Sequence, residues 1–558
     1  MKRWVGSGTS RVAQVLLLFI LGFCCLSLFL AVPARAQSGP TVDSLQEQIR
    51  ALQEQSEKQI KALQDQVDAL KAAQAKQAEE AAQAAAAAPP QAPSEGKGLI
   101  SNTPVKVTLG GYLAMTGIYR DRYTGSDTNS KWNIGSGGIP LPNSPNYYMN
   151  ELRGSARASR LSLLAEGKDD YEALSGYVEI DFLGGAATSS ANSQGTNGYY
   201  PRLRHAYATY DTTSGWHLLA GQSFTLLTMD SEGITPRKEL LPMVVDNTYV
   251  PGFTYTRNPQ VRLVKDFGNG VWVGASLESP QAIVTAGGLS TSAPTGSSGY
   301  SGTLLNPNNA FYDVSITNNS NLPTGAATSS LSLDEYPDMA AKIVVEPGFG
   351  HWEGYALGRA FTDRTLISGS RSNQTTYGWG AGAGVLLPVV AKYVDFMASF
   401  LGGEGIGRYG AAGMYDAVVN PLTGQLDPIR EFQTLTGVVL HATPRLDLYT
   451  YAGIEKESSR DIYTARGTTG GFGAAAYAPL SLYLEGQSPT LINGLTASSV
   501  AQANSVEQIV FGGWYSFYKG KYGAMSVGIE DAYTRVYVFG LNGETLNTIM
   551  ACIRYYPF

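Results

Sequence analysis

The chain has 558 residues, a formal net charge of -6 and only 15% charged residues. This acidic balance gives no indication of nucleic-acid binding, and three cysteines are too few for a disulfide-stapled scaffold. Glycine and tyrosine are abundant, with 64 and 33 copies, whereas histidine occurs four times.

The start of the chain has the layout of a secretory signal. Lys2 opens a positive region, an uncharged run follows at 15–30, and Ala34 and Ala36 have the A-x-A spacing of a cleavage site. We predict that residues 1–36 are a signal peptide. The apolar run is slightly long, so an uncleaved membrane anchor is the alternative.

Cleavage would change both the charge and the thiol content. The signal carries four positive residues and no acids, so removing it takes the net charge from -6 to -10. One cysteine, Cys552, would remain. An exported chain with a single thiol has no internal disulfide, so its stability must come from hydrogen bonding, burial or oligomerisation.

A periplasmic coiled coil and an Ala-rich helix are predicted at 37–88. The apolar residues recur in steps of three and four, with one stutter near Ser56, which is typical of a coiled-coil seam. The seam residues are Val42, Leu45, Ile49, Leu52, Ile60, Leu63, Val67 and Leu70. A lone amphipathic helix is the alternative. The composition of the seam favours a coiled coil of two helices, that is, a dimer. A Pro/Gly-rich linker follows at 89–104.

From residue 105 onward the sequence predicts an all-β domain at 105–558. About sixteen short runs alternate apolar with polar residues, and short and long connections alternate between them, as in outer-membrane barrels. The runs are 105–121, 155–168, 173–184, 202–212, 215–224, 253–267, 270–279, 338–346, 351–363, 375–388, 392–403, 431–442, 445–457, 505–518, 521–533 and 546–558. Eighteen strands remain possible, because Gly-rich stretches can hide a strand.

The alternation places apolar residues on one face of each strand. Leu446 and Leu448 oppose Asp447 and Tyr449, for example. In lipid every backbone group must be paired, so such a sheet has to close on itself. We therefore expect an antiparallel transmembrane β-barrel with an apolar outer face and a charged lumen.

The chain ends on Phe558, which resembles the C-terminal signature of bacterial outer-membrane proteins. That resemblance makes Phe558 a membrane-insertion signal read by the barrel-assembly machinery. Counting back in twos from Phe558 places Arg554 on the face expected to be apolar. A bulge at Pro557 would switch the parity, and the sequence leaves the choice open.

The order of signal, coiled coil, linker and barrel resembles the DcaP-like trimeric porins. The segments ASRLSLLAEG, GYVEIDFLG, PRLRHAYATY and LLAGQSF resemble the early strands of that family. The resemblance implies a homotrimer in the lipid of a Gram-negative outer membrane, with the coiled coil in the periplasm. It conflicts with the dimer that the seam favours, and we expect the trimer. The sucrose-porin type, with about eighteen strands, is the nearest alternative family.

Catalytic patterns are sparse. His205, His217, His351 and His441 are scattered, and none has metal-ligand spacing with a partner. We expect no cofactor, no metal and no enzymatic activity. A barrel hydrolase remains the alternative, because a catalytic triad need not be close in sequence.

Charged residues on the polar faces of the early strands are predicted to line the pore. These are Arg160, Glu179, Asp181, Arg202, Arg204 and Arg262. Facing rows of opposite charge would create a transverse field that orients polar solutes. The alternative is that these charges only solvate the lumen and balance one another.

In trimeric porins the third long loop folds inward and narrows the pore, and here it would offer Asp230, Glu232, Arg237 and Lys238. We expect a passive diffusion channel for small hydrophilic solutes. Anions such as organic acids or dicarboxylates are favoured, because arginine holds a carboxylate with two hydrogen bonds. A sugar porin with an aromatic slide and a tether between membrane and cell wall are the alternatives.

Overall fold

The computed structural model describes residues 104–124, 139–140, 145–184, 200–246, 250–285, 300–303, 310–313, 332–367, 370–420, 422–465, 468–473, 503–539 and 544–558. Contacts divide the chain into two units, Met1–Glu95 and Gly96–Phe558, and every described residue belongs to the second. The predicted signal peptide, the coiled coil and the linker up to residue 103 lie outside the described residues.

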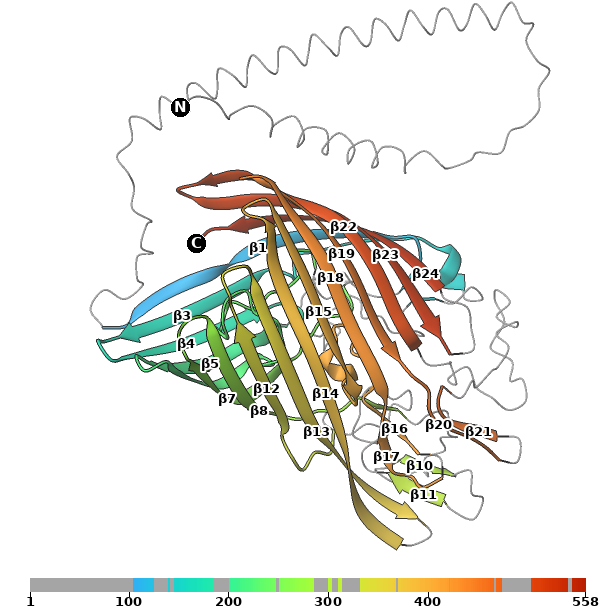
Figure 1. Cartoon of the computed structure of the whole chain (residues 1–558). Coiled ribbons are helices and arrows are strands. Elements are labelled where there is room, and N and C mark those ends of the chain that lie inside the picture. The colour runs from blue at the N-terminus through green and yellow to red at the C-terminus, as the bar shows by residue number, and fades with distance from the viewer. Residues whose placement is uncertain are drawn as a thin grey trace, which may run out of the picture. The chain divides into compact units, whose positions relative to one another are not determined.

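Sixteen antiparallel strands form one closed barrel (Figure 1). In order around the barrel they are β1 (Lys106–Arg120), β3 (Arg160–Lys168), β4 (Glu172–Asp181), β5 (Arg202–Thr212), β6 (Trp216–Phe224), β7 (Arg257–Asp266), β8 (Val271–Glu278), β12 (Asp338–Val345), β13 (His351–Ile367), β14 (Ser370–Val390), β15 (Val394–Glu404), β18 (Arg430–Thr443), β19 (Leu446–Glu457), β22 (Ala503–Gly520), β23 (Gly523–Val538) and β24 (Glu544–Tyr556). Each of the sixteen predicted runs contains one of these strands or overlaps it.

The barrel closes between its first and last strands. β24 pairs antiparallel with β1 from Leu113, opposite Tyr555, to Arg120, opposite Thr548. This pairing removes the free sheet edges, which satisfies the backbone requirement that the sequence predicted. The closed barrel of sixteen strands is therefore confirmed.

The predicted run at 155–168 is divided. A short strand that the sequence did not predict, β2 (Glu151–Ser155), pairs with residues 116–120 of β1. β3 pairs with residues 106–112 of β1. Between them the Ser159 hydroxyl accepts a hydrogen bond from the Ala114 N–H at 2.9 Å. A side chain thus replaces a ladder bond, so the backbone remains satisfied across the break.

The two ends of the barrel differ. Short turns such as 169–171 and 213–215 lie at one end, which we call the short-turn end, and longer connections lie at the other. Figure 1 shows small elements gathered at the long-loop end. The labelled ones are β10 (Tyr300–Thr303), β11 (Ala310–Asp313), β16 (Ala417–Val419), β17 (Leu426–Pro428), β20 (Arg460–Ala465) and β21 (Thr468–Phe472). A further short strand, β9 (Val284–Thr285), pairs with β16.

Helical structure within the described residues is limited to the short 3-10 turns η1 (Pro145–Tyr148) and η4 (Gly407–Tyr409). None of the described helices has the length and apolar character needed to span a membrane.

The strands alternate as predicted. On β24, Ile549 and Ile553 are exposed on the outer face, whereas Met550 and Cys552 are buried inside. Arg554 continues the inner series and donates a hydrogen bond to the Val245 carbonyl. β24 ends at Tyr556. Pro557 and Phe558 lie beyond the strand, so counting back in twos from Phe558 does not give the face of Arg554. Arg554 therefore does not lie on the apolar face.

Candidate functional site

Residues 225–256 connect β6 to β7, and we call this segment the inner loop; its described residues, 225–246 and 250–256, fold into the lumen. The Met243 N–H donates to the Tyr451 hydroxyl at 3.0 Å, and the Trp514 indole N–H donates to the Met243 carbonyl at 2.9 Å. Tyr451 on β19 and Trp514 on β22 lie across the barrel from β6 and β7 in strand order. The inner loop therefore spans the lumen, as expected of the third long loop.

Carboxylates on the barrel wall hold the inner loop by its backbone. The N–H of Val245 donates to Glu530 at 2.7 Å, and that of Gly252 donates to Glu455 at 2.7 Å. Leu226 N–H donates in the same way to Glu278 at 2.9 Å. Because the donors are backbone groups, these contacts fix the path of the loop independently of its side chains.

The predicted constriction residue Asp230 is bound to the wall. Its carboxylate lies 2.7 Å from Lys342 Nζ, which also lies 2.9 Å from Glu353. All three side chains are buried. The pKa of Asp230 is raised because burial outweighs the attraction of Lys342. Asp230 therefore acts as an anchor of the loop in this structure.

The other three predicted constriction residues are more exposed. Lys238 Nζ lies 3.1 Å from Glu232, and both side chains are more than half exposed. Arg237 reaches the wall, where its guanidinium lies 3.8 Å from Glu166 and 5.6 Å from the centre of the Tyr177 ring. These charges compensate one another or pair with the wall, so they do not form one charged rim.

The structure brings together five of the six predicted pore-lining residues. In the strand register, Arg160 on β3 faces Asp181 on β4, which in turn faces Arg202 on β5. Arg202 donates two hydrogen bonds to Asp181, at 3.0 and 2.7 Å. Arg204 donates to Glu179 and also to Asp181, the latter at 3.0 Å.

A β-bulge explains how Arg202 and Arg204 reach the same acid. Glu179 pairs with His205 and Ile180 pairs with Leu203, so Arg204 is the extra residue on β5. The bulge turns both Arg204 and His205 inward, and both are buried. Simple alternation along β5 does not predict that His205 points inward.

Arg262 is separate from this group. It lies on β7, is buried, and donates to the Gln260 side chain and to the Phe224 carbonyl. Phe224 ends β6, where the inner loop begins. Arg262 therefore supports the start of the inner loop, and the expectation that it lies close to Arg160 is not met by any contact among the described residues.

A cavity of about 420 Å³ lies between the inner loop and the wall. Arg160, Arg204, Arg554 and Lys519 line it together with the acids Asp246 and Asp447. The aromatic residues Tyr112, Tyr255, Trp514 and Tyr556 also line it. Arg554 and Lys519 are not among the predicted pore-lining residues, because the sequence left the parity of the last strand open and Lys519 lies beside a turn.

Arginines dominate the electrostatic surroundings of Tyr255. Tyr255 belongs to the inner loop and is buried, which raises its pKa. The nearby Arg204, Arg257 and Arg160 act in the opposite direction and outweigh burial, so the pKa of Tyr255 is lowered. The acids Glu179 and Asp181 therefore do not neutralise the arginines completely.

Arg257, at the start of β7, was also missed. Its guanidinium lies 5.3 Å from the centre of the Phe224 ring and 5.2 Å from that of Tyr255. It has the same strand parity as the outward-facing Val261, so alternation would place it on the outer face. An arginine among aromatic residues at the end of a long loop is the only sequence signal for it.

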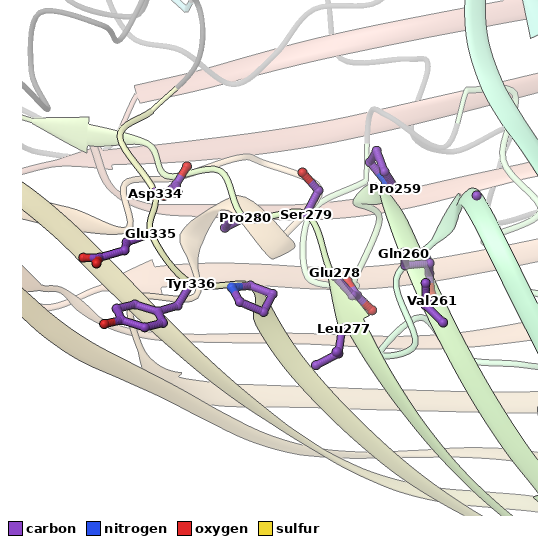
Figure 2. Close-up of a pocket in the computed structure, with 12 residues that line it drawn as sticks. Pro259, Gln260, Val261, Leu277, Glu278, Ser279, Pro280, Asp334, Glu335 and Tyr336 are labelled. Atoms are coloured by element: carbon purple, nitrogen blue, oxygen red, sulfur yellow. The ribbon is translucent and has the colours of Figure 1, made fainter.

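A second concavity, of about 490 Å³, lies on the outer side of the barrel. Figure 2 shows Val261, Leu277 and Tyr336 along it, between β7, β8 and the segment before β12. Their side chains are exposed. It shares no residue with the lumen cavity. Within the described part of the chain, no three His, Cys, Asp or Glu side chains are arranged to hold a metal. We therefore place the candidate site in the lumen.

The closed 16-stranded barrel with a loop across its lumen defines the fold of an outer-membrane channel. In structure the chain is similar to the outer membrane channel DcaP of Acinetobacter baumannii, with a TM-score of 0.52 and 17% identity, over 82% of this chain and 99% of that one. The predicted resemblance to DcaP is thus confirmed at the level of the fold.

Weaker similarities extend to OmpT of Vibrio cholerae, with a TM-score of 0.40 and 11% identity over 83% of this chain and all of that one. An anion-selective porin from Comamonas acidovorans gives 0.40 and 9% identity over 81% and 99%. No protein family and no curated protein matches the chain by sequence.

Proposed function

We propose that the protein is an outer-membrane porin that lets small hydrophilic solutes diffuse through its lumen, with a preference for anions such as organic acids. The observation that supports this most directly is the lining of the lumen cavity, in which the cations Arg160, Arg204, Arg554 and Lys519 outnumber the acids Asp246 and Asp447. A cavity bordered by the inner loop and lined by arginines offers an anion both attraction and hydrogen-bond donors.

The net charge of the chain argues the other way, because it is negative. Net charge is not lumen charge, however. Screening at physiological ionic strength acts over about 8 Å, so distant acids contribute little to the field in the cavity. The local balance of Arg160, Arg202, Arg204 and Arg257 against Glu179 and Asp181 leaves an excess of positive charge.

A sugar porin is the second candidate function. Tyr112, Tyr255, Trp514 and Tyr556 all line the cavity, and aromatic faces suit the apolar faces of sugar rings. The arginines favour the anion channel, because neutral sugars need no excess of positive charge.

Bilayer electrophysiology tests the proposal. Purified protein in a planar bilayer with a KCl gradient should conduct. Its reversal potential should have the sign of the chloride equilibrium potential. Arg202→Gln combined with Arg204→Gln should move the reversal potential toward the potassium equilibrium potential. A cation-selective wild type would contradict the anion preference, and a protein that does not conduct would contradict the porin function.

The assembly is also a proposal. We infer a homotrimer in the outer membrane, inserted by the barrel-assembly machinery with Phe558 as part of the signal. Cross-linking of the membrane-extracted protein should stop at trimers. Cross-linking that stops at dimers would favour the coiled-coil seam over the family resemblance.

A further inference from the structure

His351 lies between two carboxylates at the short-turn end of the barrel. It is the first residue of β13, and its side chain is only 4% exposed. Its Nδ1 atom lies 2.9 Å from Glu346, which directly follows β12, and its Nε2 atom lies 3.1 Å from Glu353 on β13. A neutral imidazole carries one N–H, so it can donate to only one of two ionised acids. Both contacts are hydrogen bonds when the ring is doubly protonated and positively charged.

The same two acids hold the tip of the inner loop. We define this tip as the segment between Asp230 and Glu239, which pair with each other across its base. Glu346 accepts a hydrogen bond from the Gly233 N–H at 2.7 Å, and Glu353 accepts one from the Asp230 N–H at 3.3 Å. One imidazole therefore connects two acids that both bind the tip through its backbone.

The tip lies at the short-turn end of the lumen. Gly233 sits against the ring of Trp272, the second residue of β8, so close that an added Cβ would lie 2.6 Å from it. The Arg237 guanidinium lies 3.8 Å from Glu166, near the end of β3. β8 begins and β3 ends at short turns. A movement of the tip would therefore change the width of the lumen at this end.

The two carboxylates differ in how firmly they are held. Glu353 is fully buried and lies 2.9 Å from Lys342 Nζ, which also binds Asp230 at 2.7 Å. The Glu346 side chain, in contrast, is 27% exposed. Glu346, Glu353 and Lys342 are the charged groups that act on the His351 ring, with Asp230 behind Lys342. If the ring loses its charge, Glu346 is the acid that can turn to water, because Glu353 keeps its lysine.

We propose that His351 is a proton-operated latch for the tip of the inner loop. The charged ring keeps Glu346 on the wall and the Gly233 N–H bound to it. Loss of the proton lets Glu346 turn away and releases the tip. Because histidine usually exchanges its proton between pH 5 and 8, the latch is closed at acidic pH and open at alkaline pH. It does not depend on the proposed anion preference.

Hydrogen–deuterium exchange of the folded protein in detergent tests the latch without a measurement of current. The protection of peptides from the tip, corrected for the intrinsic pH dependence of exchange, should fall about tenfold between pH 6 and 8.5. This is the loss expected for one charge-assisted hydrogen bond. A wild-type protein with equal corrected protection at both pH values overturns the latch. A channel that prefers potassium contradicts the proposed function and leaves this result unaffected.

Two variants should remove the pH dependence in opposite directions. His351→Phe keeps a ring but donates to neither acid, so its tip should be released at both pH values. Glu346→Gln keeps an acceptor for the Gly233 N–H and adds an amide donor for the neutral imidazole, so its tip should stay protected at both. Glu346→Gln changes a partly exposed side chain without changing its size, and it decides the question if His351→Phe does not assemble.

Other titrating groups are distinguished by the same measurement. Burial raises the pKa of Glu239 to about 7, so Glu239 also titrates in this range. A pH step that persists in Glu346→Gln would belong to Glu239 or to another group and would overturn the latch. His441 is the matched control, because it lies 2.6 Å from Asp447 and 3.2 Å from Asp395, and neither acid bonds to a described residue of the inner loop. His441→Gln should keep the wild-type step, and loss of the step in this variant would assign it to His441 instead.

Discussion

Arg204 Nη1 lies 3.0 Å from Asp181 Oδ2, and only 1% of the Arg204 side chain and none of the Asp181 side chain is exposed. The two residues come from neighbouring strands, β5 and β4, and a bulge in β5 turns Arg204 toward the acid. The most buried charges in the predicted pore are thus committed to each other.

Arg204→Gln should destabilise the barrel, because it removes from two buried acids, Glu179 and Asp181, a guanidinium that donates to both of them. Breaking a buried ion pair from one side costs about 3 kcal/mol or more. The unfolding midpoint in urea, followed by the mobility of the folded barrel on gels, should fall. Arg430→Gln provides the control, since its pair with Glu404 is mostly exposed and should contribute less than about 1 kcal/mol. Equal midpoints for the two variants would show that the Arg204 contacts do not stabilise the fold.

Glu530→Ala should loosen the inner loop. The Glu530 carboxylate accepts hydrogen bonds from the Val245 N–H and from the Tyr449 hydroxyl, both at 2.7 Å. Removing it leaves buried donors unsatisfied, at about 1–3 kcal/mol. Single-channel records should show larger conductance or more frequent current steps than the wild type. Glu530→Gln keeps an acceptor and should behave more like the wild type; identical records for the alanine variant would mean that this anchor does not hold the loop.

Gly233→Ala should disturb the turn of the inner loop. Gly233 has φ +54, and an added Cβ would lie 2.6 Å from the Trp272 ring. Gly268→Ala is a matched control, because Gly268 has φ +73 but nothing within 4 Å of its Cβ position. Both variants lose the conformational freedom of glycine, at about 1 kcal/mol. Only Gly233→Ala adds the steric conflict, so its thermal midpoint should fall further; a larger fall for Gly268→Ala would contradict this arrangement.

Anion selectivity should decrease as the pH rises from about 6 to 8. Burial, and after it the negative charge of Asp230, raises the pKa of Glu239 on the inner loop to about 7, while Arg262 opposes the rise. Glu239 is thus protonated and neutral below this pKa and adds a negative charge above it. Because the pKa is raised relative to the unfolded chain, ionisation also lowers stability as the pH passes from about 4.5 to 7.

Reversal potentials measured across this pH range check the prediction. Glu239→Gln stays neutral at every pH, so it should retain the low-pH selectivity and flatten the profile. A wild-type profile that Glu239→Gln leaves unchanged would assign the titration to another group.

The sequence by itself determined the strands, because each depends on local alternation. The period-two pattern of apolar residues is visible within ten residues, and lipid outside forces the sheet to close. The run that contains Glu179 and Asp181 thus predicted both its strand and its inward face. The strand break at Ser159 was not visible in the pattern, since a side-chain hydrogen bond can replace a ladder bond without changing the composition.

Only the tertiary structure decided which charges are free. Arg202 and Arg204 were predicted to line the pore, yet both are bound to acids on β4, whereas Arg257, which alternation places on the outer face, makes no ion pair with any described residue. Asp230 was predicted in the constriction loop, and only the structure shows that Lys342, more than a hundred residues away, binds it to the wall. Pairing of this kind depends on strand register, on a one-residue bulge and on the path of a loop across the lumen. These are long-range properties, and no local pattern of residues encodes them.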